Sequence, residues 1–451
     1  MSSRIIIFLI GLSICANGLV HPLYRGPLVV PRSTTTHMYG GKVGPQSFDL
    51  PTQIFCNVEL NGEQLETVGF DMDFTLAQYN EAFDLLAFEG AKQKLYSVLG
   101  YPEEVLDFKY SSTSFRRGLV IDKERGNVIK IDRHKYVRKV YHGYEELETA
   151  PRKTIYGSQI GLKFTESNYV NIDTMFLLID AVLFTSLVDL KDRHPSVITK
   201  SYEQIYNDVR LCVDLCHRDG VIKDAVMREP AKYIIYDEMM VPMLQRLKRA
   251  GKKVFLLTNS MWEYTNVVMD YLVHSRGEYT NMKWEELFDV IIVGAAKPGF
   301  LSNDYLSLFQ VDPTGTLRNI EDKDALSLQT ISGGKNIFQG GHWQDLHKIM
   351  EISSGDKVLY VGDHMYSDIL RSKRSLGWRT CLIIPELEHE LQVAQDHLDL
   401  AAEVMNMRTL QYDLDEYLDL LRLRAVMGVD VHEQLREAEA KVWKTCTPGV
   451  Q

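Results

Sequence analysis

The feature that most constrains this chain is a short apolar run, Val68 to Phe70, that ends in two carboxylates, Asp71 and Asp73. Such a run predicts a buried strand. Side chains two residues apart on a strand point the same way, so both carboxylates leave its end together. Two like charges this close repel each other, and a bound Mg²⁺ would relieve the repulsion because hard cations prefer oxygen ligands. One carboxylate could then attack phosphorus while the other handles protons. The alternative is a strand-to-helix turn capped by aspartates.

The overall composition is that of a globular protein large enough for two or more hydrophobic cores. The chain has 451 residues, of which 45% are hydrophobic and 25% are charged. Its net charge of −11 argues against nucleic acid as a partner. An anionic substrate stays open, because nearby cations and metal ions set the local field of a site.

The first 48 residues have the features of a targeting leader. Arg4 precedes an apolar run from Ile5 to Cys15, small residues follow the run, and no acidic residue occurs before Asp49. The run is too short for a stable membrane span. We therefore expect a cleavable leader that directs the protein to an organelle, a plastid or a mitochondrion. A secreted protein and a cytoplasmic protein with an uncleaved arm are the alternatives.

Three patterned segments follow the two carboxylates. Residues Glu81 to Lys109 have the amphipathic spacing of a helix, and residues Leu119 to Tyr141 alternate as in a β-meander. Residues Met175 to Leu190 are strongly apolar and predict a buried helix. This part of the chain is therefore predicted to mix helices with a sheet.

After Asp237, apolar strands alternate with helices, which predicts a parallel, doubly wound sheet of the α/β class. Ligands bind such sheets beyond the carboxyl ends of the strands. Polar residues follow the ends of four predicted strands: Asp71 and Asp73 after Val68–Phe70, Thr258 after Val254–Leu257, Lys297 after Val290–Val293, and Asp363 and Asp368 after Val358–Val361. Their shared position favours one functional site over four unrelated structural roles.

The short motifs at these strand ends resemble the four motifs of the haloacid dehalogenase superfamily of phosphotransferases. The motifs are Asp71-Met72-Asp73-Phe74-Thr75, Thr258-Asn259-Ser260, Lys297-Pro298 and Gly362-Asp363 through Asp368. The stretch from Val361 to Leu387 is similar, nearly residue for residue, to the family of cytosolic purine 5′-nucleotidases. The similarity covers roughly Gln53 to Glu390.

The resemblance implies a Rossmann-like haloacid dehalogenase core with a large mixed α+β cap inserted after the first motif. The expected domains are a leader (1–48), a phosphohydrolase core (49–78 and 228–390), a cap (79–227) and a C-terminal helical extension (391–451). The extension carries acidic and apolar residues at helical spacing, typical of helices packed on the core or on a second subunit. A homo-oligomer is therefore open.

The resemblance also implies a role for each carboxylate. Asp71 would be the nucleophile, and Asp73 would protonate the leaving oxygen and then activate water. Mg²⁺ would be bound by Asp71, by the backbone carbonyl of Asp73 and by Asp363. Asp368 would shape the coordination sphere.

The transferring phosphoryl group would be held by Thr258, Asn259 and Lys297. Phosphoryl transfer needs an in-line nucleophile and fixed positive charge on the equatorial oxygens, which these residue types can supply. From the residues alone, Lys297 could instead be a solvated lysine before a proline.

A predicted helix in the cap places Arg210, Asp214 and His217 on one face, and Lys223 follows it. In the nucleotidases that the chain resembles, the matching positions contact the base and the phosphate. An exposed helix with surface ion pairs remains the alternative. The resemblance also implies an aromatic residue that stacks on the purine before the apolar cap helix, for which the sequence offers Tyr169.

These features predict an enzyme that uses Mg²⁺ to hydrolyse nucleoside 5′-monophosphates through an aspartyl-phosphate intermediate. Inosine 5′-monophosphate (IMP) and guanosine 5′-monophosphate (GMP) are the expected substrates, and no nucleic acid is expected as a partner. Two alternatives stay open, a phosphatase for another small phosphate ester and a nucleotide-binding protein with little turnover.

Overall fold

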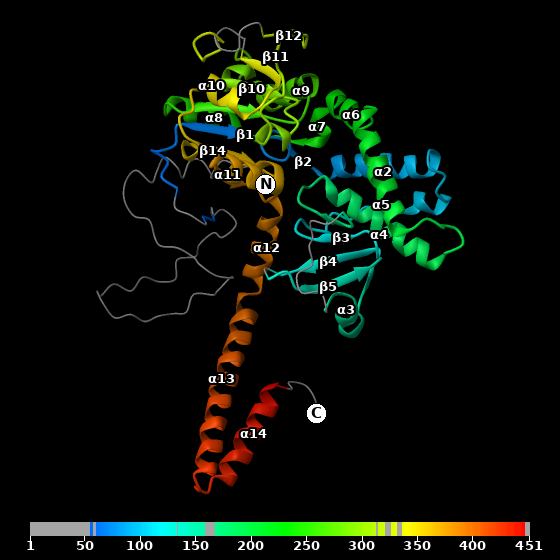
Figure 1. Cartoon of the computed structure of the whole chain (residues 1–451), viewed down its shortest axis with the longest axis vertical. Coiled ribbons are helices and arrows are strands. Elements are labelled where there is room, and N and C mark those ends of the chain that lie inside the picture. The colour runs from blue at the N-terminus through cyan, green and yellow to red at the C-terminus, as the bar shows by residue number, and fades with distance from the viewer. Residues whose placement is uncertain are drawn as a thin grey trace. The chain divides into compact units, whose positions relative to one another are not determined.

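The computed structural model describes residues 55–56, 60–132, 134–157, 167–312, 314–320, 326–331 and 336–446. The predicted leader lies outside these residues, so its targeting function stays a prediction. The described chain forms two compact units (Figure 1). One extends from Leu60 to Ile384, and the other contains the C-terminal helices that begin at Pro385.

An eight-stranded sheet in the order β12-β11-β13-β10-β9-β1-β14-β15 forms the centre of the first unit. The six neighbouring strands β13, β10, β9, β1, β14 and β15 pair in parallel. The edge strands β11 and β12 pair antiparallel. The strands are β1 (Thr67–Phe70), β9 (Lys253–Leu257), β10 (Val290–Val293), β11 (Leu308–Val311), β12 (Leu317–Asn319), β13 (Ile337–Gly340), β14 (Val358–Gly362) and β15 (Arg379–Leu382). The predicted parallel α/β core is confirmed, although the antiparallel edge was not predicted.

Both faces of the sheet are covered, as expected for a doubly wound fold. Along β9, Val254 and Leu256 belong to a hydrophobic core that also contains side chains of α8 (Met240–Arg249) and α9 (Trp262–His274). The alternate residues Phe255 and Leu257 belong to a second core, with side chains of α10 (Trp343–Ile349). This alternation follows from the two-residue period of a strand, and it explains why the central strands are continuously apolar.

Gly69 allows a large side chain to cross the central strand. A Cβ atom at this position would lie 2.0 Å from the ring of Phe255. The Phe255 ring stacks on Tyr360 in β14, with the ring centroids 6.0 Å apart. Because the Tyr360 hydroxyl reaches the carboxyl end of the sheet, this packing helps to support the site described below.

The cap between β1 and α8 combines helices with a separate antiparallel sheet in the order β6-β5-β4-β3-β7 (Figure 1). Its strands are β3 (Val120–Asp122), β4 (Asn127–Ile131), β5 (Val137–His142), β6 (Glu145–Glu146) and β7 (Tyr169–Asn171). Its helices are α2 (Glu81–Ser97), α3 (Thr149–Tyr156), α4 (Leu177–Arg193), α5 (Tyr202–Arg218), α6 (Lys223–Arg228) and α7 (Pro230–Tyr233). The predicted mixed α+β cap is confirmed.

The helix predicted from Glu81 to Lys109 is too long. Helix α2 ends at Ser97, and Gly100 adopts a left-handed conformation with φ of 70°. Such a residue interrupts a helix, and a separate 3-10 helix follows at Glu103–Asp107. A two-stranded ribbon, β2 (Gln78–Tyr79) paired with β8 (Ile234–Ile235), joins the chain segments that enter and leave the cap.

The second unit contains α12 (Pro385–Asp396), α13 (Leu398–Val426) and α14 (His432–Cys446). Helices α13 and α14 pack through a small hydrophobic cluster formed by Leu418, Leu421, Val431 and Ala438. Helix α12 begins at Pro385, six residues before residue 391, where the helical extension is predicted to start. Among the described residues, no helix has both the length and the apolar character needed to cross a bilayer.

Candidate active site

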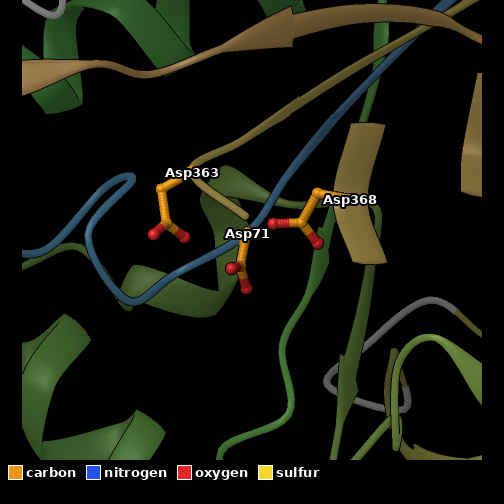
Figure 2. A group of neighbouring side chains, drawn as sticks. All are labelled: Asp71, Asp363 and Asp368. Carbon is orange, nitrogen blue, oxygen red and sulfur yellow. The ribbon is translucent and has the colours of Figure 1, made fainter. Parts of the chain in front are cut away.

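Three buried carboxylates meet at the carboxyl end of the central sheet. Asp71 follows β1, Asp363 follows β14, and Asp368 lies in a single π-helical turn, Met365–Leu370. One oxygen from each carboxylate lies within 4.8 Å of the others, and Figure 2 shows the three side chains as neighbours. Parallel strands β1 and β14 end side by side, which brings residues far apart in the sequence into one cluster.

Lys297 is the buried cation of this cluster. Its Nζ atom lies 2.9 Å from Asp71 Oδ1 and 2.8 Å from Asp368 Oδ1. The ammonium also donates to the Tyr360 hydroxyl at 3.0 Å, and that hydroxyl donates to the Leu257 carbonyl at 3.1 Å. Lys297 is therefore not a solvated lysine, because its charge faces the carboxylates inside the protein.

Burial is the main influence on the pKa values of the carboxylates in the cluster. Burial, together with the nearby Asp368 and Asp73, raises the pKa of Asp71 to about 7, although Lys297 opposes the shift. Burial and the charges of Asp71 and Asp368 also raise the pKa of Asp363 well above its usual value. For Lys297, burial alone would lower the pKa, but the attraction of Asp368 and Asp71 raises it well above its ordinary value.

The donor set fits a hard divalent cation. Asp363 Oδ2 is buried and has no hydrogen-bond partner among the described residues, which is costly unless another group satisfies it. All ligand atoms of the cluster are carboxylate oxygens, the type that Mg²⁺ prefers. Asp368 differs from Asp363, because its Oδ1 accepts from Lys297 and its Oδ2 accepts from the His364 N–H at 3.1 Å. Asp363 Oδ2 therefore accepts no hydrogen bond that a bound cation would displace, although Arg117 Nη1 lies 3.9 Å away.

The Asp73 carboxylate is not part of this cluster. Its Oδ1 accepts a hydrogen bond from the Tyr79 hydroxyl at 2.6 Å, and its Oδ2 accepts one from Ser260 Oγ at 2.7 Å. The family resemblance implies that the backbone carbonyl of Asp73 is a metal ligand, and that ligand stays a prediction. The separation suits two carboxylates with different tasks.

Thr258 and Asn259 form the turn after β9. Thr258 is buried, and its Oγ1 accepts from the Ser260 N–H at 3.1 Å. The Asn259 amide exchanges two hydrogen bonds with the main chain of Lys297, accepting at 2.6 Å and donating at 3.2 Å. Asn259 thereby fixes the segment that carries the buried lysine.

The predicted cap residues Arg210 and Asp214 form ion pairs on helix α5. Arg210 Nη1 lies 2.9 Å from Asp180 Oδ2 in α4, and Arg210 Nη2 pairs with Asp214 Oδ1. Burial raises the pKa of Asp180 to about 6 against the effect of Arg210. Arg210 is thus anchored within the cap, while Asp214 keeps 52% of its side chain exposed.

The other two predicted cap residues, His217 and Lys223, pack against aromatic side chains. The His217 ring packs edge-on against Phe176 with centroids 5.8 Å apart, and Phe176 packs against Phe74 at 4.8 Å. Lys223 Nζ lies 5.5 Å above the ring of Tyr264 in α9. Burial, aided by Arg210 and Lys223, lowers the pKa of His217 to about 4.

Comparison with known proteins identifies the family of the chain. A model of the 5′-nucleotidase family matches residues 54–447. The chain belongs to the 5′-nucleotidase family. The family resemblance predicted from the motifs is thereby confirmed.

Two similar proteins bear on this nucleotidase-family chain. A 5′-nucleotidase domain-containing protein of Dictyostelium discoideum is 29% identical over 364 residues, which make up 79% of this chain and 60% of the relative. The match therefore spans less than two thirds of that relative. A crystal structure of a Clostridium difficile protein described as a candidate phosphatase covers 70% of this chain and 83% of its own, at 14% identity and a TM-score of 0.26.

Two residues that contact predicted site residues, Arg117 and Phe176, were not among the predicted candidates. Arg117 reaches from the cap to the core, where it donates to the carbonyls of Asp363 and Ile383 and lies 3.9 Å from Asp363 Oδ2. Phe176 packs edge-on against His217 and directly precedes the apolar helix α4. Tyr169 instead lies in the hydrophobic core of the cap sheet. Tyr169 and Phe176 both precede the apolar helix α4. Only the position of Phe176 directly before that helix could have indicated it.

Proposed function

We propose that the protein is a Mg²⁺-dependent phosphohydrolase that converts nucleoside 5′-monophosphates, IMP and GMP in preference, to nucleoside and phosphate. One observation carries the proposal. In a chain of the 5′-nucleotidase family, Asp71 lies at the carboxyl end of the central strand, 2.9 Å from a buried lysine and beside two further buried carboxylates.

Asp71, Asp363 and the backbone carbonyl of Asp73 would hold the Mg²⁺, and Asp368 would shape its surroundings. Asp363 Oδ2, which accepts no hydrogen bond among the described residues, supports this assignment. The bound ion supplies positive charge that offsets the repulsion among the carboxylates and stabilises charge on the phosphoryl oxygens.

The reaction has two steps. An oxygen of Asp71 attacks phosphorus in line with the leaving O5′, so that an O–P bond forms while the P–O5′ bond breaks. Asp73 gives its proton to the leaving ribose oxygen. Asp73 then takes a proton from a water molecule, which attacks the aspartyl-phosphate and releases inorganic phosphate. Lys297 and Thr258 bind the phosphoryl oxygens throughout, and Asn259 holds the Lys297 segment in place.

The cap would select the base. Asp214 would accept hydrogen bonds from N1–H of a 6-oxopurine and from the 2-amino group of guanine, and Arg210 would orient Asp214 through their ion pair. Phe176 and His217 would contact the ring, and Lys223 would contact the phosphate. The half-exposed Asp214 carboxylate and the packing of His217 on Phe176 support these assignments.

One observation favours a second candidate function. Arg210 is engaged by both Asp180 and Asp214, which is also what a purely structural ion-pair network would show. In that case the core chemistry would act on a different small phosphate ester, or the protein would bind nucleotides with little turnover.

A panel of phosphate esters tests these functions. The full chain is supplied with Mg²⁺, and phosphate release is measured from IMP, GMP, AMP, two pyrimidine monophosphates and glucose 6-phosphate. The proposal expects the highest kcat/KM for IMP and GMP. Faster release from glucose 6-phosphate would favour a phosphatase for another small phosphate ester. Binding of IMP without phosphate release from any ester would favour a nucleotide-binding protein.

A further inference from the structure

The proposed acid–base residue Asp73 is held by hydroxyl groups on both of its oxygens. The Tyr79 hydroxyl lies 2.6 Å from Oδ1, and Ser260 Oγ lies 2.7 Å from Oδ2. An ionised carboxylate only accepts hydrogen bonds, so both hydroxyls donate to it. The Tyr79 oxygen can then accept from the Tyr264 hydroxyl, 2.9 Å away. A chain of hydroxyls thus runs from Tyr264 through Tyr79 to Asp73.

The packing around Tyr79 gives its hydroxyl a fixed position. Its ring packs against Phe74, with centroids 5.1 Å apart, and against Phe83, with centroids 4.3 Å apart. Its backbone belongs to β2, which pairs with Ile234 of β8. A residue fixed in this way can hold a partner without further loss of conformational freedom.

We propose that Tyr79, supported by Tyr264, is a positioning residue that orients the Asp73 carboxyl toward the leaving oxygen. The inference rests on the proposed function, in which Asp73 transfers the protons. Proton transfer requires the acid to lie within hydrogen-bond reach of the oxygen it protonates. Each hydroxyl can donate or accept, so Asp73 keeps its partner both with and without the proton. Without Tyr79, Oδ1 loses the donor that fixes rotation of the carboxyl group.

This role predicts a dependence on the leaving group. A ribose alkoxide is a poor leaving group and needs the proton of Asp73. The 4-nitrophenolate ion is stable and leaves without one. Loss of positioning should therefore slow the first chemical step with IMP more than with 4-nitrophenyl phosphate, and kcat/KM reports on that step.

The test compares two conservative variants. Tyr79→Phe removes the hydroxyl and keeps the ring. Tyr101→Phe is the matched control, because the Tyr101 hydroxyl also donates to a carboxylate, Asp208 Oδ2, at 2.7 Å in the cap. We expect Tyr79→Phe to lower kcat/KM for IMP about 10-fold, a fraction of what a general acid contributes, through kcat with KM unchanged. The value for 4-nitrophenyl phosphate should change less than about 2-fold, and Tyr101→Phe should change neither. Tyr264→Phe should give the Tyr79→Phe pattern with a smaller loss.

Equal losses with the two substrates, an increase in KM in place of a fall in kcat, or full activity of Tyr79→Phe would each overturn the inference. If 4-nitrophenyl phosphate is not a substrate, the division between kcat and KM for IMP decides. Asp73→Asn separates this inference from the proposed function. An inactive Asp73→Asn beside an undisturbed Tyr79→Phe removes only the positioning role, whereas an active Asp73→Asn removes the role of Asp73 and the inference with it.

Discussion

The core and the cap provide groups in opposite states of solvation. Asp71 and Asp363 are buried in the core, and burial is the main cause of their raised pKa values. Asp214 in the cap is half exposed and paired with Arg210 on the surface of a helix. Charges in a dry site interact strongly with a substrate, whereas exposed charges are screened by water and salt. This contrast agrees with the proposal that the core carries the chemistry and the cap selects the substrate.

The two regions also respond in opposite ways to acid. Because the pKa of Asp71 is raised to about 7, the folded core without metal takes up this proton more readily than the unfolded chain. Because the pKa of His217 is lowered to about 4, the folded cap takes up that proton less readily than the unfolded chain. As the pH falls, protonation of Asp71 therefore stabilises the folded core without metal, whereas protonation of His217 destabilises the folded cap.

Removal of the metal should give the largest effect and should act only through the core. We expect EDTA to lower phosphate release at least about 10³-fold, since several kcal/mol of charge stabilisation are lost. Mg²⁺ should restore the activity, and Ca²⁺ should restore it poorly because its larger shell disturbs the in-line geometry. Asp363→Asn should abolish the response to Mg²⁺, whereas the exposed Asp107→Asn should not. Full turnover in a chelated sample would contradict this account of the core.

The base preference should be the next effect in size and should act only through the cap. Sites that pair a polar group of the substrate reject an analogue that lacks it, so kcat/KM for IMP should exceed that for AMP by at least ~10²-fold. Adenine offers an acceptor at N1 and leaves Asp214 facing a lone pair. Asp214→Asn should shrink the ratio by slowing IMP turnover. An unchanged ratio in Asp214→Asn would remove this residue from the base site and leave the core chemistry intact.

The smallest expected effect is on the pH dependence of the free energy of unfolding, and it arises from His217 in the cap. An unfolded histidine gains its proton as the pH falls through 6.5, whereas folded His217 gains it near 4. The stabilisation present above pH 6.5 is therefore lost between pH 6.5 and 4, by about 3 kcal/mol. His217→Gln should lose correspondingly less on acidification in urea denaturation, while the exposed His389→Gln should behave as the wild type. Identical pH curves for all three proteins would mean that His217 is not held neutral by burial.

The core could be predicted from the sequence because each strand and the polar residues after it are neighbours in the chain. Each apolar strand predicted its own burial, and parallel strands end at the same edge, so Asp71, Thr258, Lys297 and Asp363 were expected together. The prediction required no knowledge of which strands are neighbours. The structure adds that β1 lies between β9 and β14, which places Asp71 at the centre of the group.

The contacts of the side chains could not be predicted, because they depend on how distant elements pack. Alternation along a strand places Asp73 on the same side as Asp71, yet the turn after β1 directs its carboxylate to Tyr79 and Ser260. The contacts of Arg117 could not be predicted from the residues around it, since its partners Asp363 and Ile383 lie far along the chain. Burial at the cap sheet, which decides against Tyr169 as the stacking residue, is likewise a property of the fold.

The central claim is that Asp71 carries the phosphoryl group, and chemical trapping of the intermediate tests it most directly. The full chain is mixed with IMP and Mg²⁺, quenched with acid during turnover, and reduced with sodium borodeuteride, which converts an aspartyl-phosphate to deuterated homoserine. Peptide mass spectrometry should find this residue at position 71 of the wild type and not in Asp71→Asn, which should release no phosphate. Homoserine at another aspartate, or continued phosphate release by folded Asp71→Asn, would contradict the account.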